Sequence, residues 1–476
     1  MDEKQFPSSS KIPDHLKQEI LAGRCIAFVG AGFSAPVIPG WKNLLINLAE
    51  NLPKDVERSR REDLISLANQ ATTALQLEGC GQALRDAYGN TETGLEAFEQ
   101  AVAQAVAPNR AVDDEMARRL KALAAIPFRA ILTLNYDNLI EPSGPLGRYD
   151  DILREPAYWW ERLDWENNWS LQTPLIKLHG DANGDPQNNP IVLGRTDYRR
   201  ILYENGTYAN FMRAALGTYT FLFMGFSFTD AYLNELRSEV LAFLNSHDKK
   251  GQRPNPVGYA ILEDQAPSVR TFFEQHEGIE VLHYETEKKL DPRSNQLRPV
   301  GWVGFTDWLE AIEKETCVAA RLRALLGEQA QIVWIDPQHN DNNQRGLTFL
   351  RNHVGVNVAE LDHPDQLDKT SHQHAVLVIS HFGYNSDGPS QLAKALENMQ
   401  PWGERPPVVV FAGVDFANQN RRLANRLGAI DLATNWTDLM RVIEQVFGRD
   451  ELNSGPDAAT QTGFSRATIS PSKQQT

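Results

Sequence analysis

The chain has 476 residues and a mass of 53.4 kDa, more than one ordinary domain, and 41% of its residues are hydrophobic, enough to build real cores. A formal net charge of −15 and a pI near 5.3 argue against a general nucleic-acid binder, because neutralising phosphates requires clustered Lys and Arg. The three cysteines, Cys25, Cys80 and Cys317, are too far apart to indicate a disulfide framework or a four-thiolate zinc site.

The first residues of the chain, 1–13, are polar and acidic, and we expect them to form a tail rather than a signal peptide. No window of the sequence approaches the ~18 consecutive apolar residues of a membrane-spanning helix. Unpaired cysteines suit a reducing compartment. The sequence therefore predicts a cytoplasmic protein that has no membrane partner.

Helices and strands alternate over residues 14–300, the predicted first domain. A short helix over 14–23 precedes an apolar strand over 25–32 that runs into a glycine turn, and about 42–125 has helical periodicity. Further strands are expected at 128–137, 173–181, 191–198, 219–230, 256–263 and 278–285. This order predicts an α/β fold with a doubly wound, Rossmann-like parallel sheet, over which the helices of 42–125 form a cap.

A smaller α/β domain is predicted for residues 330–448, after connecting helices over 301–329. Its strands are expected at 331–336, 356–361, 375–380, 407–413 and 428–431, with helical stretches between them. Five such steps indicate the flavodoxin or receiver type of fold. The last residues, 449–476, are polar and without periodicity, and we expect them to be disordered.

Small or polar residues follow four of the predicted strands in the first domain. They are Gly30, Ala31, Gly32 and Ser34 after the first strand, then Asn135, Tyr136 and Asp137, then His179, Gly180 and Asp181, and later Gly225, Ser227 and Asp230. Ligands of open α/β sheets bind beyond the carboxyl ends of the strands, so these residues are expected to converge on one crevice. Glycines permit close approach to a ligand, and a helix that begins after such a turn favours phosphate.

Each of these features has a plainer explanation when it is taken alone. The complete G-x-G-x-x-G dinucleotide pattern is absent, because Ala35 stands three residues after Gly32. A lone His179 is more often a hydrogen-bonded structural histidine than a catalyst, and Asn135 alone could be a turn or cap residue. For Asp230 we favour the role of N-cap to the following helix.

Four segments together resemble the sirtuin-like superfamily, and more closely the sirtuin-like domains of bacterial antiviral defence systems. In chain order they are GAGFSAPVIPGW, TLNYDNLIE, IKLHGD and FLFMGFSFTD, and the resemblance covers about residues 14–290. It implies a sirtuin-type fold that binds NAD. The residues that it assigns to the dinucleotide are Gly30, Ala31, Gly32 and Ser34 around the pyrophosphate, and Gly225 and Ser227 toward the adenosine.

The same resemblance implies three catalytic residues: His179 as the catalytic histidine, Asn135 near the nicotinamide ribose, and Asp137 beside the nicotinamide. A histidine can take a proton near neutral pH, here from a ribose hydroxyl or from water held by Asn135. The predicted activity is an NAD glycohydrolase that releases nicotinamide and ADP-ribose. The implied role is a regulated abortive-infection effector that depletes NAD.

Two alternative functions remain open. A protein deacylase of the sirtuin type is disfavoured, because the chain lacks the four-cysteine zinc module and continues as VIPGW where those enzymes have G-I-P-D-F-R. We therefore expect no zinc or other metal. A non-enzymatic sensor of NAD or ADP-ribose is the second alternative. Because an NAD-depleting enzyme must be silent at rest, a homo-oligomer or a defence-system partner protein is expected to control it.

The segment 330–448 resembles a response-regulator receiver domain that has lost its phosphoryl chemistry. Asp336 follows the first strand, but Ser380 stands where the phosphoacceptor aspartate is expected, and Ala412 replaces the usual hydroxyl residue. The stretch 428–438 contains no lysine. We expect a pseudo-receiver that regulates the first domain, senses a ligand or contacts a protein.

Overall fold

A computed structural model describes most of the chain. The described residues are 12–35, 37–89, 91–108, 111–141, 146–153, 158–165, 169–184, 190–204, 206–228, 230–246, 256–263, 266–285, 288–290, 297–299, 303–338, 341–368, 370–372, 374–381, 388–399, 406–413, 422, 424 and 429–448. The predicted tails, apart from the last two residues of 1–13, lie outside this described part.

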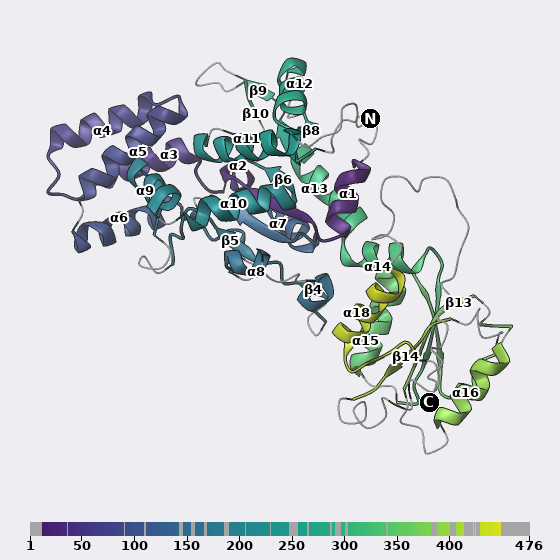
Figure 1. Ribbon diagram of the computed structural model, residues 1–476. Helices are drawn as coiled ribbons and strands as arrows, with labels where there is room; N and C mark the ends of the chain where they lie inside the picture. Colours follow the sequence, from purple (N-terminus) through teal and green to yellow (C-terminus); the bar gives the residue numbers. More distant parts are fainter. Residues whose placement is uncertain are drawn as a thin grey trace, which may run out of the picture. The chain divides into compact units, whose positions relative to one another are not determined.

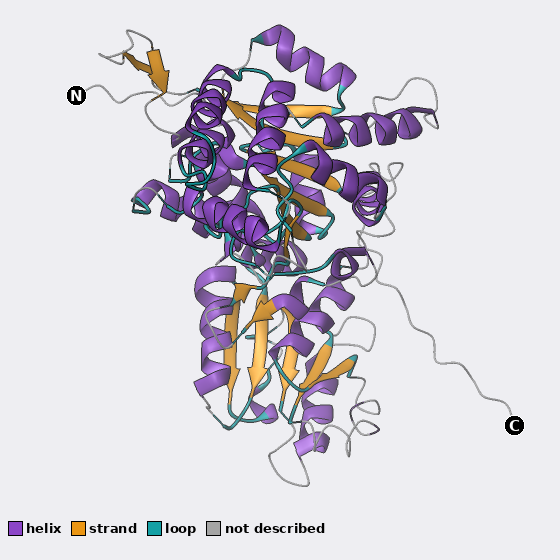
Figure 2. Ribbon diagram, turned by 90° about the vertical axis from the view of Figure 1, so that its left-hand side faces the viewer, coloured by secondary structure: helices purple, strands orange, loops and turns teal. Residues whose placement is uncertain are grey.

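The chain divides into two compact units, each built around a parallel β-sheet with helices on both faces (Figure 1; Figure 2). The first unit contains residues 1–162 and 171–317, and the second contains 163–170 and 318–476. Helix α13 (Val303–Thr316) therefore belongs to the first unit, which extends beyond residue 300.

The first unit is organised by a six-stranded sheet in the order β5-β2-β1-β6-β7-β8. The strands are β1 (Cys25–Val29), β2 (Ala130–Thr133), β5 (Leu175–Lys177), β6 (Thr220–Met224), β7 (Gly258–Glu263) and β8 (Ile279–Tyr284). All of these neighbours pair in parallel. Counted along the chain, this is the 3-2-1-4-5-6 order of doubly wound dinucleotide-binding folds, which confirms the predicted fold class. The order reverses between β1 and β6, so the ligand crevice is expected there.

Helices cover both faces of this sheet, and the first unit also contains a short antiparallel hairpin. The helices are α1 (Asp14–Leu21), α2 (Ala31–Ser34), α3 (Trp41–Glu50), α4 (Arg58–Gln70), α5 (Ala74–Tyr88), α6 (Glu92–Ala105), α7 (Asp114–Ala125), α8 (Tyr149–Leu153), α9 (Arg195–Arg199), α10 (Thr207–Thr218), α11 (Ala231–Ser246), α12 (Pro267–His276) and α13, with the short turns η2 (Trp159–Arg162) and η3 (Arg200–Glu204). Strands β9 (Lys288–Leu290) and β10 (Leu297–Pro299) form this hairpin, whereas β3 (Leu163–Asp164) pairs with β4 (Ser170–Leu171) at the two ends of the segment 163–170, which belongs to the second unit.

The predicted helical segment over 42–125 is confirmed by α3 to α7, which share a hydrophobic core of their own. Local signals explain where two of these helices begin. At α5, Thr73 and Gln76 form a reciprocal capping box, and at α7 the Asp113 side chain accepts a hydrogen bond from the backbone N of Met116. Such caps satisfy backbone N–H groups that have no partner inside the helix.

The prediction of a strand over 191–198 is wrong. Residues 191–193 lie outside any strand, and Gly194 precedes helix α9. The Asp197 carboxylate accepts a hydrogen bond from the backbone N of Gly194 at 3.0 Å, which closes the start of this helix. The apolar run before it is buried, and the backbone N of Val192 donates to the carbonyl of His179 at 2.9 Å. Burial of a short apolar run does not distinguish a strand from a buried loop.

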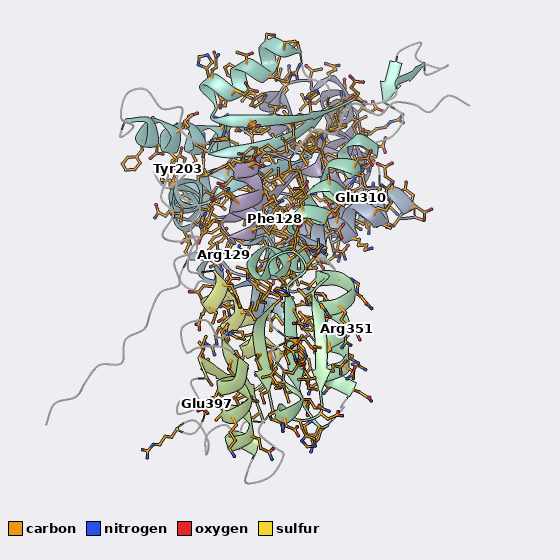
Figure 3. The ribbon with its side chains drawn as sticks, turned by 90° about the vertical axis from the view of Figure 1, so that its right-hand side faces the viewer. Phe128, Arg129, Tyr203, Glu310, Arg351 and Glu397 are labelled. Atoms are coloured by element: carbon orange, nitrogen blue, oxygen red, sulfur yellow. The ribbon has the colours of Figure 1, made fainter. Side chains whose placement is uncertain are left out.

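Strand β1 lies at the centre of the core and is buried along its whole length. Because side chains alternate along a strand, Ala27 packs with α1, α7 and α13 on one face, while Phe28 packs with α10 and α11 on the other. Both faces are thus apolar, as a parallel sheet covered by helices requires. Figure 3 contrasts Phe128, which is fully buried just before β2, with Tyr203, which is 74% exposed and extends away from the ribbon.

The second unit contains a five-stranded sheet in the order β12-β11-β13-β14-β15, with every pair parallel. Its strands are β11 (Gln331–Ile335), β12 (Asn357–Leu361), β13 (Ala375–Ser380), β14 (Val408–Phe411) and β15 (Asp431–Ala433), and its helices are α14 (Val318–Leu326), α15 (Asp341–Phe349), α16 (Gly388–Met399) and α18 (Trp436–Phe447), with the short turns η4 (Leu350–Val354) and η5 (Pro364–Gln366). Counted along the chain, this is the 2-1-3-4-5 order of flavodoxin-like folds, as predicted.

The strand ends of the second unit carry the residues that the receiver resemblance singled out. Asp336 is buried, and its carboxylate accepts hydrogen bonds from the Asn343 side chain at 3.1 Å and the Gln338 backbone at 2.8 Å. Ser380 ends β13 and is fully buried.

Across the described part of the chain, no helix combines the length and the apolar character needed to cross a bilayer.

The two turns that follow β1 and β6 press directly against each other. The backbone N of Gly32 donates to the carbonyl of Gly225 at 2.9 Å. Gly225 has a φ of +61°, and a Cβ atom there would lie 2.0 Å from the backbone N of Phe33. A Cβ on Gly30 would lie 2.6 Å from the carbonyl oxygen of Gly225. Glycine is therefore required here by the contact between the two turns.

This contact predicts different costs for two glycine substitutions. Gly23 also has a positive φ, +67°, but a Cβ there would meet nothing within 4 Å. Gly23→Ala should lower the free energy of unfolding by about 1 kcal/mol through backbone strain alone. Gly225→Ala should lower it by roughly 1–3 kcal/mol more, because the backbone of the facing turn must move. Urea unfolding of both variants measures this, and equal losses would contradict the proposed contact.

Candidate active site

A cavity of about 600 Å³ lies beyond the carboxyl ends of the strands of the first sheet. Its walls come from the turns after β1, β2, β5 and β6, the end of β7, and helical residues such as Leu44 of α3 and Phe273 of α12. This volume is in the range of small-molecule sites, and its place at the strand-order reversal is where doubly wound folds bind their ligands.

All the residues predicted to be catalytic or to bind the dinucleotide line this cavity except Ser34: Gly30, Ala31, Gly32, Asn135, Asp137, His179, Gly225 and Ser227. Gly180 and Asp181, which were also expected at the crevice, do not line it, whereas Tyr136 and Asp230 do. The predicted residues that line it come from four separate strand ends, so the expected convergence of distant segments on one crevice is present.

Ser34 supports the site from behind the cavity wall. It is fully buried in α2, and its hydroxyl accepts a hydrogen bond from Nδ2 of Asn135 at 3.2 Å. The same Nδ2 lies 3.4 Å from the carbonyl of Gly30, and the backbone N of Asn135 donates to the Thr133 hydroxyl at 3.0 Å. The carboxamide of Asn135 is therefore held by the first glycine turn.

His179 follows β5 and is 3% exposed. Its Nε2 atom is buried and has no hydrogen-bond partner among the described residues. Burial lowers the pKa of His179 below its ordinary value, and the nearby Asp230 carboxylate opposes this shift. The imidazole is thus neutral at neutral pH and can accept a proton, and an unpartnered buried polar atom on a cavity wall indicates a place for a ligand or water.

Asp230 has two roles, one of which the sequence did not predict. Its Oδ1 accepts a hydrogen bond from the backbone N of Leu233 at 2.8 Å, which confirms the predicted N-cap of α11. Its Oδ2 lies 4.0 Å from Nε2 of His179 and accepts a hydrogen bond from the Tyr198 hydroxyl at 3.2 Å. One carboxylate therefore caps a helix and faces the candidate base.

Tyr198 is a lining residue that the sequence interpretation missed. It belongs to α9, and its ring meets that of His179 edge to face with centroids 5.1 Å apart. The signal that could have found it is the pair Gly194 and Asp197, three residues apart, which is typical of a helix start. Treating 191–198 as a strand hid this signal.

Asp137 is a buried carboxylate on the cavity wall. Its Oδ1 accepts a hydrogen bond from the backbone N of Leu139 at 3.0 Å, and burial raises its pKa above the ordinary value for an aspartate. Nearby, the buried Lys177 pairs with Glu141 at 2.5 Å and with Asp181 at 2.9 Å. These ion pairs fix the segment that carries His179, so Lys177 and Asp181 serve its position.

The charged side chains on the cavity wall are acidic. Asp137, Asp230 and Glu263 line it, and the described lining residues include no lysine or arginine. Among the described residues there is also no group of three His, Cys, Asp or Glu side chains arranged to hold a metal ion. An anionic ligand would therefore meet backbone amides and helix ends rather than fixed cations.

Comparison with known proteins was made for both sequence and structure. Residues 129–282 match the SIR2-like domain family. The chain is 27% identical over 278 residues to the NAD(+) hydrolase ThsA of Enterococcus faecium, covering 57% of this chain and 50% of that protein. It is 24% identical to the protein of the same name from Cytobacillus dafuensis, covering 66% and 57%, and 27% identical to that of Acinetobacter baumannii, covering 53% and 47%.

The chain thus spans about half the length of these curated relatives. A solved structure of a two-component response regulator/GGDEF domain protein is 15% identical and covers 48% of this chain and 80% of its own, but its TM-score of 0.23 is too low to support a common fold. The family match, which begins at β2 and runs into β8, includes three of the four strand ends that build the cavity. Within the first unit, residues 129–282 are therefore similar to SIR2-like domains.

Proposed function

We propose that the first unit is an NAD glycohydrolase that cleaves the bond between nicotinamide and ribose. The observation that carries this proposal is the buried, unpartnered Nε2 of His179 on the wall of a cavity that Asn135 also lines. The SIR2-like match and the similarity to proteins named NAD(+) hydrolase give NAD as the substrate. In this proposal Asn135, Asp137 and His179 are the catalytic residues.

The proposed reaction requires an oriented ribose and one general base, and it requires no acid to protonate the leaving nicotinamide. Nicotinamide leaves as a neutral molecule with the electron pair of the broken C–N bond, and positive charge develops on the ribose. Water then forms the new C–O bond, and its proton passes to His179. A positioned general base contributes about 10²–10⁴ in rate. Asn135, fixed by Ser34, is suited to hold the water or a ribose hydroxyl.

The order of the strands gives a direction to the bound dinucleotide. In this proposal the pyrophosphate lies against Gly30, Ala31, Gly32, Gly225 and Ser227, on the two central turns. The nicotinamide ribose then extends toward β2 and β5, which carry Asn135 and His179. The adenosine extends toward β7, where Glu263 lines the cavity.

The biological role that we propose follows from the resemblance to defence-system domains. The chain would act in the cytoplasm, where its free cysteines are stable and NAD is abundant. There it would deplete NAD as an abortive-infection effector. Its activity would be controlled by assembly with further copies or with a defence-system protein, and the receiver-like second unit would take part in that control.

Substitution of the candidate base provides the main test. His179→Ala should lower the rate of nicotinamide release from NAD by about 10²–10⁴, because the general base is lost. NAD binding, measured by calorimetry, should largely survive. His276→Ala, an exposed histidine of α12 outside the cavity, is the matched control and should retain the wild-type rate. Product chromatography follows the reaction.

The same assay separates the alternative functions. A deacylase would consume NAD only when an acylated peptide is present. A sensor would bind NAD and release no nicotinamide in any variant. Asn135→Ala should abolish turnover if Asn135 places the nucleophile, and full activity in this variant would remove it from the proposed mechanism.

The environment of His179 predicts the pH dependence of the reaction. Burial lowers its pKa, so the neutral base persists below the ordinary value of 6.5, and the acid limb of kcat/KM should lie below pH 6.5. The negative charge of Asp230 favours the imidazolium form. Asp230→Asn removes that charge while Asn still serves as an N-cap, so the acid limb should move to still lower pH. A move to higher pH would contradict the assignment of His179 as the base.

The acidic wall predicts selectivity for NAD over NADP. A 2′-phosphate near the Glu263 carboxylate would meet like charge with no lysine or arginine among the described lining residues. Glu263→Gln should therefore raise kcat/KM for NADP relative to NAD by about tenfold, or about 1.4 kcal/mol. Glu235→Gln, an exposed residue of α11, is the control. An unchanged ratio in the Glu263 variant would place the adenosine elsewhere.

A further inference from the structure

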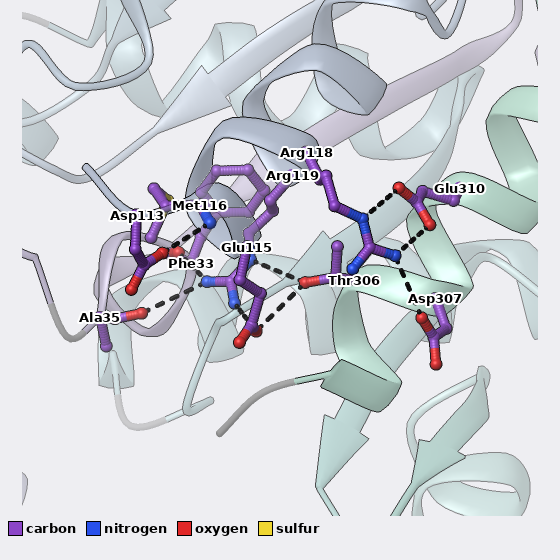
Figure 4. A network of polar contacts seen from close by, with 10 residues as sticks. All are labelled: Phe33, Ala35, Asp113, Glu115, Met116, Arg118, Arg119, Thr306, Asp307 and Glu310. Carbon is purple, nitrogen blue, oxygen red and sulfur yellow. Dashed lines mark hydrogen bonds and ion pairs between the residues drawn. The ribbon is translucent and has the colours of Figure 1, made fainter. Parts of the chain in front are cut away.

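A buried arginine holds the back of the first glycine turn. Arg119 of α7 is 1% exposed, and its Nη1 donates to the carbonyl of Phe33 at 2.5 Å and to that of Ala35 at 3.3 Å (Figure 4). These carbonyls stand at the end of α2, the single helical turn that follows the turn after β1. A single guanidinium nitrogen, Nη1, thus holds both carbonyls at the end of α2, and Arg119 itself is not among the residues that line the cavity.

The same guanidinium is anchored on α13. Its Nε lies 3.4 Å from the hydroxyl of Thr306, and its Nη2 pairs with Glu115 of its own helix at 2.9 Å. The Glu115 carboxylate also accepts a hydrogen bond from Thr306 at 3.3 Å (Figure 4). Phe305 of α13 completes the contact: the Arg119 Cζ lies 4.9 Å from the centroid of its ring.

Apolar packing joins the same two segments. The rings of Phe33 in α2 and Phe305 in α13 meet edge to face with centroids 5.9 Å apart, and both residues are buried. Because packed aromatic rings resist compression, a displacement of the first turn of α13 would be transmitted to α2. The polar and the apolar contacts therefore act on the same helical turn.

Helix α2 in turn positions the carboxamide of Asn135, because Ser34 accepts the hydrogen bond from its Nδ2 at 3.2 Å. A continuous set of contacts runs from Thr306 through Arg119 and α2 to Ser34 and Asn135. We propose that Arg119 is a positioning residue that holds Asn135 in its working geometry through α2, with α13 as the anchor. The consequence for catalysis rests on the proposed NAD glycohydrolase activity.

Helix α13, which anchors Arg119, is also the last helix of the first unit before the chain enters the second unit. Helix α13 ends at Thr316, and only Cys317 separates it from α14, the first helix of the second unit. Any process that shifts α13 along or about its axis acts on Arg119 and Phe33. The network around Arg119 is thus where a signal carried by the chain connection would reach the site.

A neighbouring arginine provides a matched control. Arg118 also joins α7 to α13, through Glu310 at 2.5 Å and Asp307 at 3.5 Å (Figure 4). Its side chain is 45% exposed, and its recorded contacts are with α13 rather than α2. Arg118→Gln therefore weakens the link between the two helices and leaves the contact with α2 intact.

Hydrogen exchange tests the positioning role without reference to activity. Arg119→Lys keeps a positive charge but replaces the planar guanidinium, whose Nη1 meets both carbonyls while its Nε and Nη2 meet Thr306 and Glu115, by a single ammonium nitrogen. The backbone amides of Gly32, Phe33 and Ile38, all hydrogen-bonded in the turn, should exchange at least tenfold faster than in the wild type. Arg118→Gln should leave these rates unchanged. Unchanged exchange in folded Arg119→Lys would overturn the proposal.

Thr306→Val provides a second variant if Arg119→Lys does not fold. It removes the hydroxyl on α13 and retains the arginine, so the same three amides should exchange faster than in the wild type, though by less than the arginine variant predicts. Exchange in α10, which packs in the hydrophobic cluster on the opposite face of the sheet from α7 and α13, should not change in a folded variant. Faster exchange throughout the first unit, or no change in the turn, would each contradict a local anchoring role.

A double-mutant cycle tests the route to Asn135. Arg119→Lys and Ser34→Ala should each lower kcat by at least tenfold. The kcat of the double variant should be no lower than that of the less active single variant. Losses that multiply would show independent effects and overturn the route. If the wild type releases no nicotinamide, the proposed activity fails, but the exchange experiment still decides whether Arg119 holds the turn.

Discussion

The direct contact between two glycine turns is the constraint on which the site depends. Gly30 and Gly32 after β1 face Gly225 after β6, and a Cβ atom on any of the three would come within 3.0 Å of the opposite turn. The glycines bring β1 and β6 into register at the point where the strand order reverses. The crevice exists because the two turns can touch there, and the same turns then form its floor. Close approach between protein segments therefore explains these glycines independently of any ligand.

Among the polar side chains around this floor, some have hydrogen-bond partners within the protein and one does not. Asn135 is held by Ser34, and Asp230 is held by the N-terminus of α11 and by Tyr198. Among the described side chains that line the cavity, only His179 has a buried polar atom, Nε2, without a hydrogen-bond partner. Leaving a buried polar atom unsatisfied costs about 1–3 kcal/mol, so the fold carries a local instability where a water or substrate group would bind. Such a cost is typical of a functional site rather than of a structural histidine.

The sequence predicted the arrangement of this site better than its details. The alternation of strands and helices, together with polar residues at four strand ends, was sufficient for the sheet, the crevice and most of the glycine and polar residues that line it. It was not sufficient for Tyr198, because the apolar run before it has the pattern of a buried strand. Nor could it place Ser34 behind the wall, since a side chain's direction in a one-turn helix depends on packing. Arg119 could not be singled out from the sequence: apart from Glu115, one helical turn before it, its partners are backbone carbonyls of α2 and Thr306, 187 positions away.

The distribution of charge explains why the proposed control of this site would work by moving the glycine turns rather than by changing a charge. The described cavity wall carries carboxylates and no cations, so the pyrophosphate of the proposed substrate would be held by backbone groups of the two turns. Backbone groups lose their alignment when a turn moves by a fraction of an ångström, whereas a flexible lysine would follow the ligand. The buried cation of this region, Arg119, stands behind the turn and binds its carbonyls instead. Under the proposed function, a small shift of α13 would change both ligand binding and the placement of Asn135, so the network around Arg119 would be a place where activity could be switched.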